Sequence, residues 1–406
     1  MSIYTYHHFP KELLVDKISN SLGIVVCIPC YNEPDLEQTL LSILTCDKPL
    51  SFIEIIVLIN ESDADNNKVS QQNELSYLLA SKFKTPSWIK IHPLYIKAIP
   101  VKFAGVGLAR KLALDEAAKR LESSNSSLKI LACFDADSVC STNYLSGLET
   151  FFANSSKEAV SIHYQHKDAD LLGGKEQQAI YLYELHLRYF VQMQAFAGLP
   201  FAYHTVGSSM ACTLRGYRRI GGMNKRKAGE DFYFLQKFIK NNACDRLHTI
   251  TVFPSSRSSD RVPFGTGRAV LKMKTEGRSL NSYHYHSFLD LKSFVDMVGS
   301  MHDCADLEVD LKTLPMTVLQ FIYEYKLNIK IAKLINNTTN QKTFKKALYQ
   351  LFDAFQLMKY LHYVRDYFYA DEDVLTLASD ALKIFNHENV EHHELLSVYR
   401  RLNLSM

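Results

Sequence analysis

The sequence has 406 residues, 47% of them hydrophobic and 22% charged, which is long enough for a large core and about two globular domains. Its 46 Lys and Arg against 43 Asp and Glu leave a formal net charge of +3, which argues against a nucleic-acid groove or a polybasic membrane surface. Residues 1–17 lack the apolar core of a signal peptide, and no stretch reaches the ~18 uninterrupted apolar residues of a membrane span. We therefore expect a cytosolic protein with small-molecule chemistry, and a peripheral contact with the inner face of the membrane stays open.

The eight cysteines lie mostly in apolar runs, as expected of reduced thiols that behave as small hydrophobic residues. Cys27 and Cys30 have the C-x-x-C spacing of redox proteins, but Cys27 lies inside a predicted strand rather than at the start of a helix. We therefore do not expect a redox site at this pair.

The N-terminal quarter of the chain predicts the alternating strands and helices of a parallel sheet. The β-branched run at 23–29 predicts a strand, the apolar spacing over 36–44 a helix, and the run at 53–59 a second buried strand. A glycine-containing segment at 104–110 then leads into another helix. It does not complete the Gly-x-Gly-x-x-Gly dinucleotide fingerprint, but Arg110 in the first turns can face a phosphate or a base.

A short apolar strand at 128–134 ends in Asp135 and Asp137, two carboxylates separated by one small residue. In open α/β sheets, ligands bind beyond the carboxyl ends of strands, and paired Asp residues suit Mg²⁺ or Mn²⁺ carrying a diphosphate. An isolated Asp-x-Asp also occurs at solvated strand ends, where Asp favours a turn. The weight of this motif therefore depends on what surrounds it.

Three segments beyond the Asp-x-Asp motif add to this prediction. Residues 180–196 predict a helix that faces the core or contacts a lipid-linked acceptor. The loop at 255–268 carries three Arg, including Arg261, and suits a diphosphate, although a solvated loop has the same composition. The rest of the chain has the periodicity of helices.

Several segments, in the expected order, resemble the family 2 glycosyltransferases. Ile28–Glu33 is similar to the P-x-Y-N-E opening of that family, Phe134–Ser138 to its Asp-x-Asp motif, Ile220–Met223 to its G-G-F, and Gly229–Asp231 to its Glu-Asp motif. The resemblance covers about residues 22–270 and implies a GT-A fold. The expected fold is thus α/β, a Rossmann-like, mostly parallel sheet flanked by helices, with an α-helical C-terminal region.

The resemblance also implies roles for individual residues. Asp231 would be the catalytic base, and Glu230 would bind the acceptor or brace the base. Asp137 and Asp135 would hold Mn²⁺ or Mg²⁺, with His286 as a third ligand, since a metal ligand downstream of the Glu-Asp motif is common in GT-A enzymes. The expected nucleotide-binding residues are Pro29, Tyr31, Glu33, Asn60, Arg110, Asp135 and Arg261.

Two positions depart from the family pattern. Asn60 stands where the second strand usually ends in an Asp that accepts a hydrogen bond from the N3–H of uracil. An Asn oxygen can accept the same bond, but its amide group could serve another base, so UDP is favoured and the base stays open. Lys111 replaces the Asn that usually follows the position of Arg110.

The implied activity is a hexosyltransferase-like, inverting transfer from a nucleoside-diphosphate sugar to a hydroxyl of a saccharide or lipid-linked acceptor, in polysaccharide or glycolipid assembly. This displacement needs a cation on the leaving phosphates and a base on the acceptor hydroxyl. We expect Asp231 to keep an ordinary pKa near ~3.9 and to act through its position in the first turn of a helix. The alternatives are a non-catalytic sugar-nucleotide-binding or scaffold protein, a nucleotidyltransferase, or a phosphatase that uses the Asp-x-Asp site.

We expect the glycosyltransferase domain to cover residues 1–275, with a nucleotide-binding half at about 22–140 and an acceptor half at about 141–275. The helical region 276–406 is expected to shape the acceptor side or to form an oligomer contact, because strand patterns stop there while amphipathic helices continue. No nucleic-acid partner is expected.

Overall fold

The computed structural model describes residues 3–7, 12–227, 229–257, 271, 273 and 279–406, which cluster into two compact units. The first unit comprises 1–167 with 205–271, and the second comprises 168–204 with 272–406. The later change of unit falls between residues 271 and 272, and the domain boundary at 275 stays a prediction. The segment 168–204, which we placed in the acceptor half of the catalytic domain, instead packs with the C-terminal helices.

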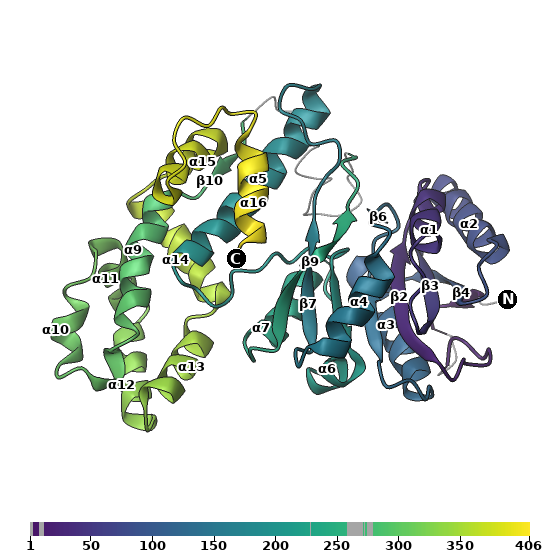
Figure 1. The fold of residues 1–406 in the computed structure, drawn as a ribbon, viewed down its shortest axis with the longest axis horizontal. Helices are drawn as coiled ribbons and strands as arrows, with labels where there is room; N and C mark the ends of the chain where they lie inside the picture. Colours follow the sequence, from purple (N-terminus) through teal and green to yellow (C-terminus); the bar gives the residue numbers. More distant parts are fainter. Residues whose placement is uncertain (1–2, 8–11, 228, 258–270, 272, 274–278) are drawn as a thin grey trace. The chain divides into compact units, whose positions relative to one another are not determined.

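In the first unit, the described strands form one sheet of nine in the order β1-β4-β3-β2-β5-β8-β7-β9-β6 (Figure 1). Neighbouring strands run parallel except at β5–β8, β7–β8 and β6–β9. The mostly parallel sheet predicted from the sequence is therefore confirmed. The bounds of the strands are β1 Ile3–Thr5, β2 Leu22–Cys30, β3 Phe52–Ser62, β4 Ile89–Ile99, β5 Ile130–Cys133, β6 Val139–Cys140, β7 Ala159–Tyr164, β8 Met210–Thr213 and β9 Cys244–Phe253.

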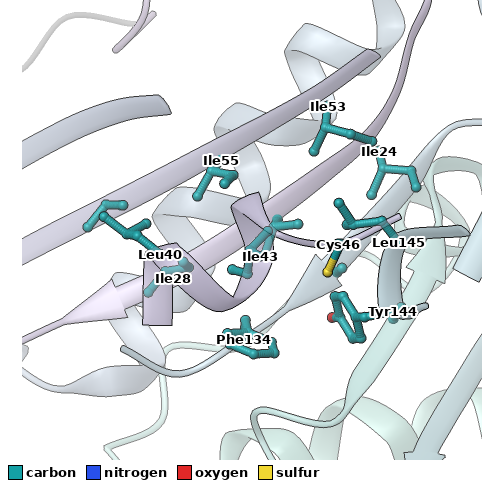
Figure 2. Packing of buried hydrophobic residues seen from close by; sticks show 14 of the residues in the cluster. Ile24, Ile28, Leu40, Ile43, Cys46, Ile53, Ile55, Phe134, Tyr144 and Leu145 are labelled. Atoms are coloured by element: carbon teal, nitrogen blue, oxygen red, sulfur yellow. The ribbon is translucent and has the colours of Figure 1, made fainter. Parts of the chain in front are cut away.

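Helices cover both faces of this sheet. Strand β2 is buried along its whole length, as expected for a parallel strand with helices on each side. Its alternate residues, such as Ile24 and Ile28, share one apolar cluster with residues of α1, α2 and α4 (Figure 2). Helix α3 packs against β2 and β3, but none of its residues, all of which are described, belongs to that cluster, so it covers the opposite face. The helices of this unit are α1 Leu36–Leu44, α2 Asn67–Lys82, α3 Val106–Glu122, α4 Tyr144–Asn154, α6 Leu214–Arg219 and α7 Glu230–Ile239.

The second unit is helical, which confirms the predicted helical C-terminal region. Helix α5 contacts α9, α15 and α16, and two short strands form an antiparallel pair. None of the helices in the described part of the chain is both long and apolar enough to cross a membrane. The elements of this unit are α5 Lys175–Phe196, β10 Asn281–Ser282, α9 Tyr285–Met297, α10 Leu307–Leu311, α11 Met316–Glu324, α12 Leu327–Asn337, α13 Gln341–Leu351, α14 Ala354–Tyr367, β11 Glu372–Asp373, α15 Val374–Leu382 and α16 Leu395–Leu404, with short 3₁₀ turns at Met301–Asp303 and Lys383–Phe385.

The polar residues that interrupt the apolar pattern of α5 face the interior of the second unit. Arg188 is fully buried and donates from Nε to Glu184 over 2.7 Å. Gln192 is also buried, and its Oε1 accepts a hydrogen bond of 2.9 Å from Asn403 Nδ2 on α16. These residues therefore connect α5 to α16 inside one core. Of the two alternatives for this helix, the structure supports the one in which it faces the core.

Candidate active site

The candidate site lies at the edge of the sheet where β2, β3 and β5 end. These three strands are parallel neighbours, with Cys30 opposite Ile59 and Cys27 opposite Cys133. The segments that follow them therefore emerge at the same edge, which is where open α/β sheets bind ligands. This arrangement brings the P-x-Y-N-E segment, the end of β3 and the Asp-x-Asp motif together.

A buried guanidinium joins two of the predicted site residues. Arg110 lies in the second turn of α3 and is 2% exposed. Its Nη2 donates to Asp135 Oδ1 over 2.5 Å, and its Nη1 donates to Glu230 Oε1. Burial by itself lowers the pKa of Arg110, but the two carboxylates raise it above the ordinary value, so the side chain stays charged. In this structure Arg110 holds two acidic residues in place rather than facing solvent.

Gly207 provides the space for this guanidinium. A Cβ atom added to Gly207 would lie 2.8 Å from both Nη atoms of Arg110 and 3.1 Å from its Cζ. Separations below 3.0 Å are not tolerated between packed atoms, so any larger residue would displace the guanidinium. The absence of a side chain at this position is therefore part of the site.

Asp231 is the second residue of α7 and so lies in the first turn of a helix, as expected from the sequence. The backbone N–H of Phe232 donates to Asp231 Oδ1 over 2.7 Å, and the helix dipole favours a carboxylate here. Burial and the adjacent Glu230 nevertheless raise the pKa of Asp231 to about 7, against the opposing influence of Arg110. The expected ordinary pKa is therefore wrong, because the local sequence does not reveal that folding buries Asp231 beside Glu230 and Asp135.

The P-x-Y-N-E segment makes a second ion-paired cluster. Glu33 is 2% exposed, and its two carboxylate oxygens accept from Arg257 Nη2 over 2.9 and 2.8 Å. Arg257 Nη1 also donates to Asp35 Oδ2 over 2.7 Å. The structure thus adds Arg257, at the start of the arginine-containing loop, to the residues near this edge. The predicted residue Arg261 lies outside the described residues.

Tyr31 directly follows β2, and Asn60 lies near the end of the neighbouring strand β3. Tyr31 Oη donates to Asp65 Oδ1 over 2.7 Å, and Asp65 Oδ2 in turn accepts from the Ser62 N–H over 2.7 Å. Asn60 is 4% exposed and lies inside β3, which continues to Ser62, rather than after its end. Pro29 lies within β2, one residue before its end. Asp65 was not among the predicted residues, although the acidic tip after β3 contained it.

The carboxylates of the Asp-x-Asp motif fit a divalent cation by their chemistry. Both follow β5, and the Asp135 side chain is 35% exposed even though it pairs with Arg110. Hard oxygen donors of this kind suit Mg²⁺ and Mn²⁺. His286 belongs to the second unit, where its ring packs 5.6 Å from that of Tyr369. In the described residues no group of three or more His, Cys, Asp or Glu side chains is arranged as a metal site, so the three-ligand set stays a prediction.

Residues 25–219 match the family described as glycosyl transferase family 2. No curated protein matches the sequence. Solved structures that resemble the chain include residues 1–349 of S. aureus TarS in complex with UDP-GlcNAc, at 14% identity and a TM-score of 0.41, covering 81% of this chain and 92% of that chain. Another is the mannosyltransferase PcManGT from Pyrobaculum calidifontis in complex with GDP-Man and Mn²⁺, at 15% identity and a TM-score of 0.36, covering 85% and 92%.

Proposed function

Because the chain belongs to glycosyl transferase family 2 through its residues 25–219, we propose that this glycosyltransferase moves a sugar, with inversion, from a nucleoside-diphosphate sugar to a hydroxyl of a saccharide or lipid-linked acceptor. The observation that carries the proposal is the buried Arg110, which donates to Asp135 of the Asp-x-Asp motif and to Glu230 of the Glu-Asp motif, next to Asp231. Burial and Glu230 raise the pKa of Asp231 to about 7. Membership of this family sets aside the phosphatase and nucleotidyltransferase alternatives.

The donor would lie over the carboxyl edge of β2, β3 and β5. There Asn60 is the candidate for contacting the base, and UDP is the favoured nucleotide because an amide oxygen can accept from uracil N3–H. Asp137 with Asp135 would hold Mn²⁺ or Mg²⁺, which when bound neutralises charge on the leaving diphosphate. Arg257 and Glu33 would fix the loop that leads towards Arg261.

Asp231 would take the proton from the acceptor hydroxyl as that oxygen attacks the anomeric carbon. Its Oδ1 already accepts from the Phe232 N–H, so we assign the proton to Oδ2. A general base works best when its pKa lies near the working pH, and a pKa of about 7 meets that condition at neutral pH. Glu230 contributes by its charge, which raises the pKa of Asp231, and Arg110 keeps Glu230 in place.

The proposal is tested by thermal shift of the full chain with UDP, GDP, CDP and dTDP, each with and without Mn²⁺. A ligand that binds only the folded state stabilises it by about 2.7 kcal/mol at a hundredfold excess over its Kd. We expect one nucleotide to raise the melting temperature more in the presence of Mn²⁺, and Asp137→Ala to abolish only the metal-dependent part.

The matching sugar nucleotide is then incubated with the enzyme, and release of nucleoside diphosphate is followed over time. Turnover supports transfer chemistry. Binding without any turnover would instead support the non-catalytic sugar-nucleotide-binding alternative, and a complete lack of nucleotide binding would contradict the proposal.

A further inference from the structure

The helical unit carries a surface cavity of about 590 Å³ that is wide open to solvent and is formed by α11, the residue before α12, and α14. This volume lies within the ~300–1,000 Å³ typical of small-molecule sites. Its walls are formed by Leu319, Gln320, Tyr323, Glu324, Lys326 and Tyr363. The wall is thus half aromatic or aliphatic and half hydrogen-bonding, a mixture that differs from an ordinary apolar groove.

The aromatic part of the wall stands on a rigid base. Phe321 is fully buried, and its ring centroid lies 5.3 Å from that of Tyr360 in the core and 5.7 Å from that of Tyr363 in the wall. The ring of Tyr367, which is 73% exposed, lies 4.9 Å from that of Tyr363. Aromatic rings held in fixed geometry at a surface provide contact area at little entropic cost, and such patches mark binding surfaces.

The polar part of the wall disfavours anionic ligands. Glu324 and Lys326 lie in the same wall, so their opposite charges cancel within it. Next to the wall, Tyr323 Oη donates to Glu308 Oε2, which adds a second carboxylate. The local charge is therefore slightly negative, which disfavours phosphate-bearing lipids and nucleic acids, while Gln320 and the carboxylates offer hydrogen bonds to hydroxyl groups.

We propose that this cavity binds a neutral saccharide and thereby holds part of the acceptor chain. A sugar ring has an apolar C–H face and an edge of hydroxyl groups, which match an aromatic wall with amide and carboxylate groups beside it. A protein partner would need about 1,200 Å² or more of total buried surface, which is more than a cavity walled by six residues provides. The identification of this saccharide as the acceptor rests on the proposed function, whereas saccharide binding itself does not.

The test uses the full chain and saturation-transfer NMR with maltotetraose, cellotetraose, chitotetraose and mannotetraose at millimolar concentration. At least one of these neutral probes should bind. Tyr323→Ala and Gln320→Ala should each weaken that binding about 2- to 10-fold, whereas Tyr323→Phe, which keeps the ring, should weaken it less. Tyr349→Ala is the matched control, because Tyr349 lies in α13 of the same unit and does not line the cavity. Hydrolysis of the donor sugar nucleotide should be unchanged in all four variants.

Binding of none of the four probes would overturn the proposal, and so would binding that Tyr323→Ala and Gln320→Ala leave intact. A protein interface is checked by light scattering: a dimer that dissociates in Tyr323→Ala would replace the saccharide with a second copy of the chain. The proposed function fails separately, by lack of donor turnover. If the protein binds a saccharide through Tyr323 but shows no turnover, the cavity is a saccharide site and the saccharide is not an acceptor.

Discussion

The two units each bury an arginine against carboxylates, but in opposite proportions. In the second unit, Glu184 accepts from both Arg188 and Arg400, at 2.7 to 2.8 Å, so two guanidiniums serve one carboxylate. In the first unit, Arg110 donates to the carboxylates of Asp135 and Glu230, and it is the cation that acts on the charge of the adjacent Asp231 among the described residues. Where guanidinium groups outnumber carboxylates, as around Glu184, the carboxylate is fully paired and the contact is structural. An excess of carboxylate leaves one group, Asp231, that holds its proton until about neutral pH.

The largest expected effect is on catalysis in the carboxylate-rich cluster. Asp231→Asn should lower sugar transfer by about 10²–10⁴-fold, because loss of a positioned base typically costs that much. Nucleotide affinity should not change, since the donor contacts are expected on β2, β3 and β5. Transfer is measured by product analysis and affinity by calorimetry. Donor hydrolysis should fall less than transfer, because bulk solvent can accept the proton from water.

A wild-type transfer rate in Asp231→Asn would remove the base assignment. Lost nucleotide affinity would instead place Asp231 at the donor site.

The second prediction compares the two buried arginines directly. Arg110→Met leaves the buried Glu230 without its partner and should destabilise the first unit by about 3–5 kcal/mol. Arg188→Met should cost less, about 1–3 kcal/mol, because Glu184 keeps Arg400. Urea unfolding measures both, with the fluorescence of Trp88, the only tryptophan, reporting on the first unit and circular dichroism on the whole chain. Equal losses for the two variants would mean that the proportion of charges does not matter.

A smaller effect is expected at the glycine beside Arg110. Gly207→Ala places a methyl group 2.8 Å from the guanidinium and should cost about 1–3 kcal/mol, together with part of the transfer activity. Gly174→Ala is the control, because the nearest atom to its added methyl group is 3.7 Å away. If Gly207→Ala behaves like this control in urea unfolding and in transfer assays, the guanidinium has more room than the structure indicates.

The smallest expected effect is a shift in pH dependence. Asp231 acts as a base only when ionised, so the transfer rate should rise with pH through about 7. Glu230→Gln removes a negative neighbour that raises this pKa, and it should move the rising limb to lower pH by roughly 1 unit. Transfer rates from pH 5 to 9 provide the test, with Asp65→Asn as a control outside the cluster. A limb that stays in place would show that Glu230 does not tune Asp231.

Much of the fold could be predicted because local patterns carry it. The β-branched run at 23–29 became β2, and the run at 53–59 became the centre of β3, since strands buried on both faces need continuous apolar sequence. The position of Asp231 in the first turn of a helix also follows from local sequence. The resemblance to the family could also be recognised from the sequence, because each motif is a short contiguous segment.

The partners of the site residues could not be predicted, because they come from distant parts of the chain. Arg257 is paired with Glu33 across 224 positions, and Arg110 with Glu230 across 120. Nothing in the periodicity of either segment indicates such a contact, which depends on where the sheet brings the loops. The same holds for the buried polar residues of α5, which looked like interruptions of an apolar stripe and proved to join α5 to α16.

The sequence by itself determined the strands and helices next to its motifs, the edge of the sheet where its acidic motifs lie, and the family that residues 25–219 match. Only the tertiary structure decided that Arg110 is buried between carboxylates, that Glu33 is held by Arg257, and that the pKa of Asp231 is raised. The physical reason is that secondary structure follows from the spacing of neighbouring residues. Ion pairing and pKa values follow instead from burial and from charges that only folding brings within a few ångströms of each other.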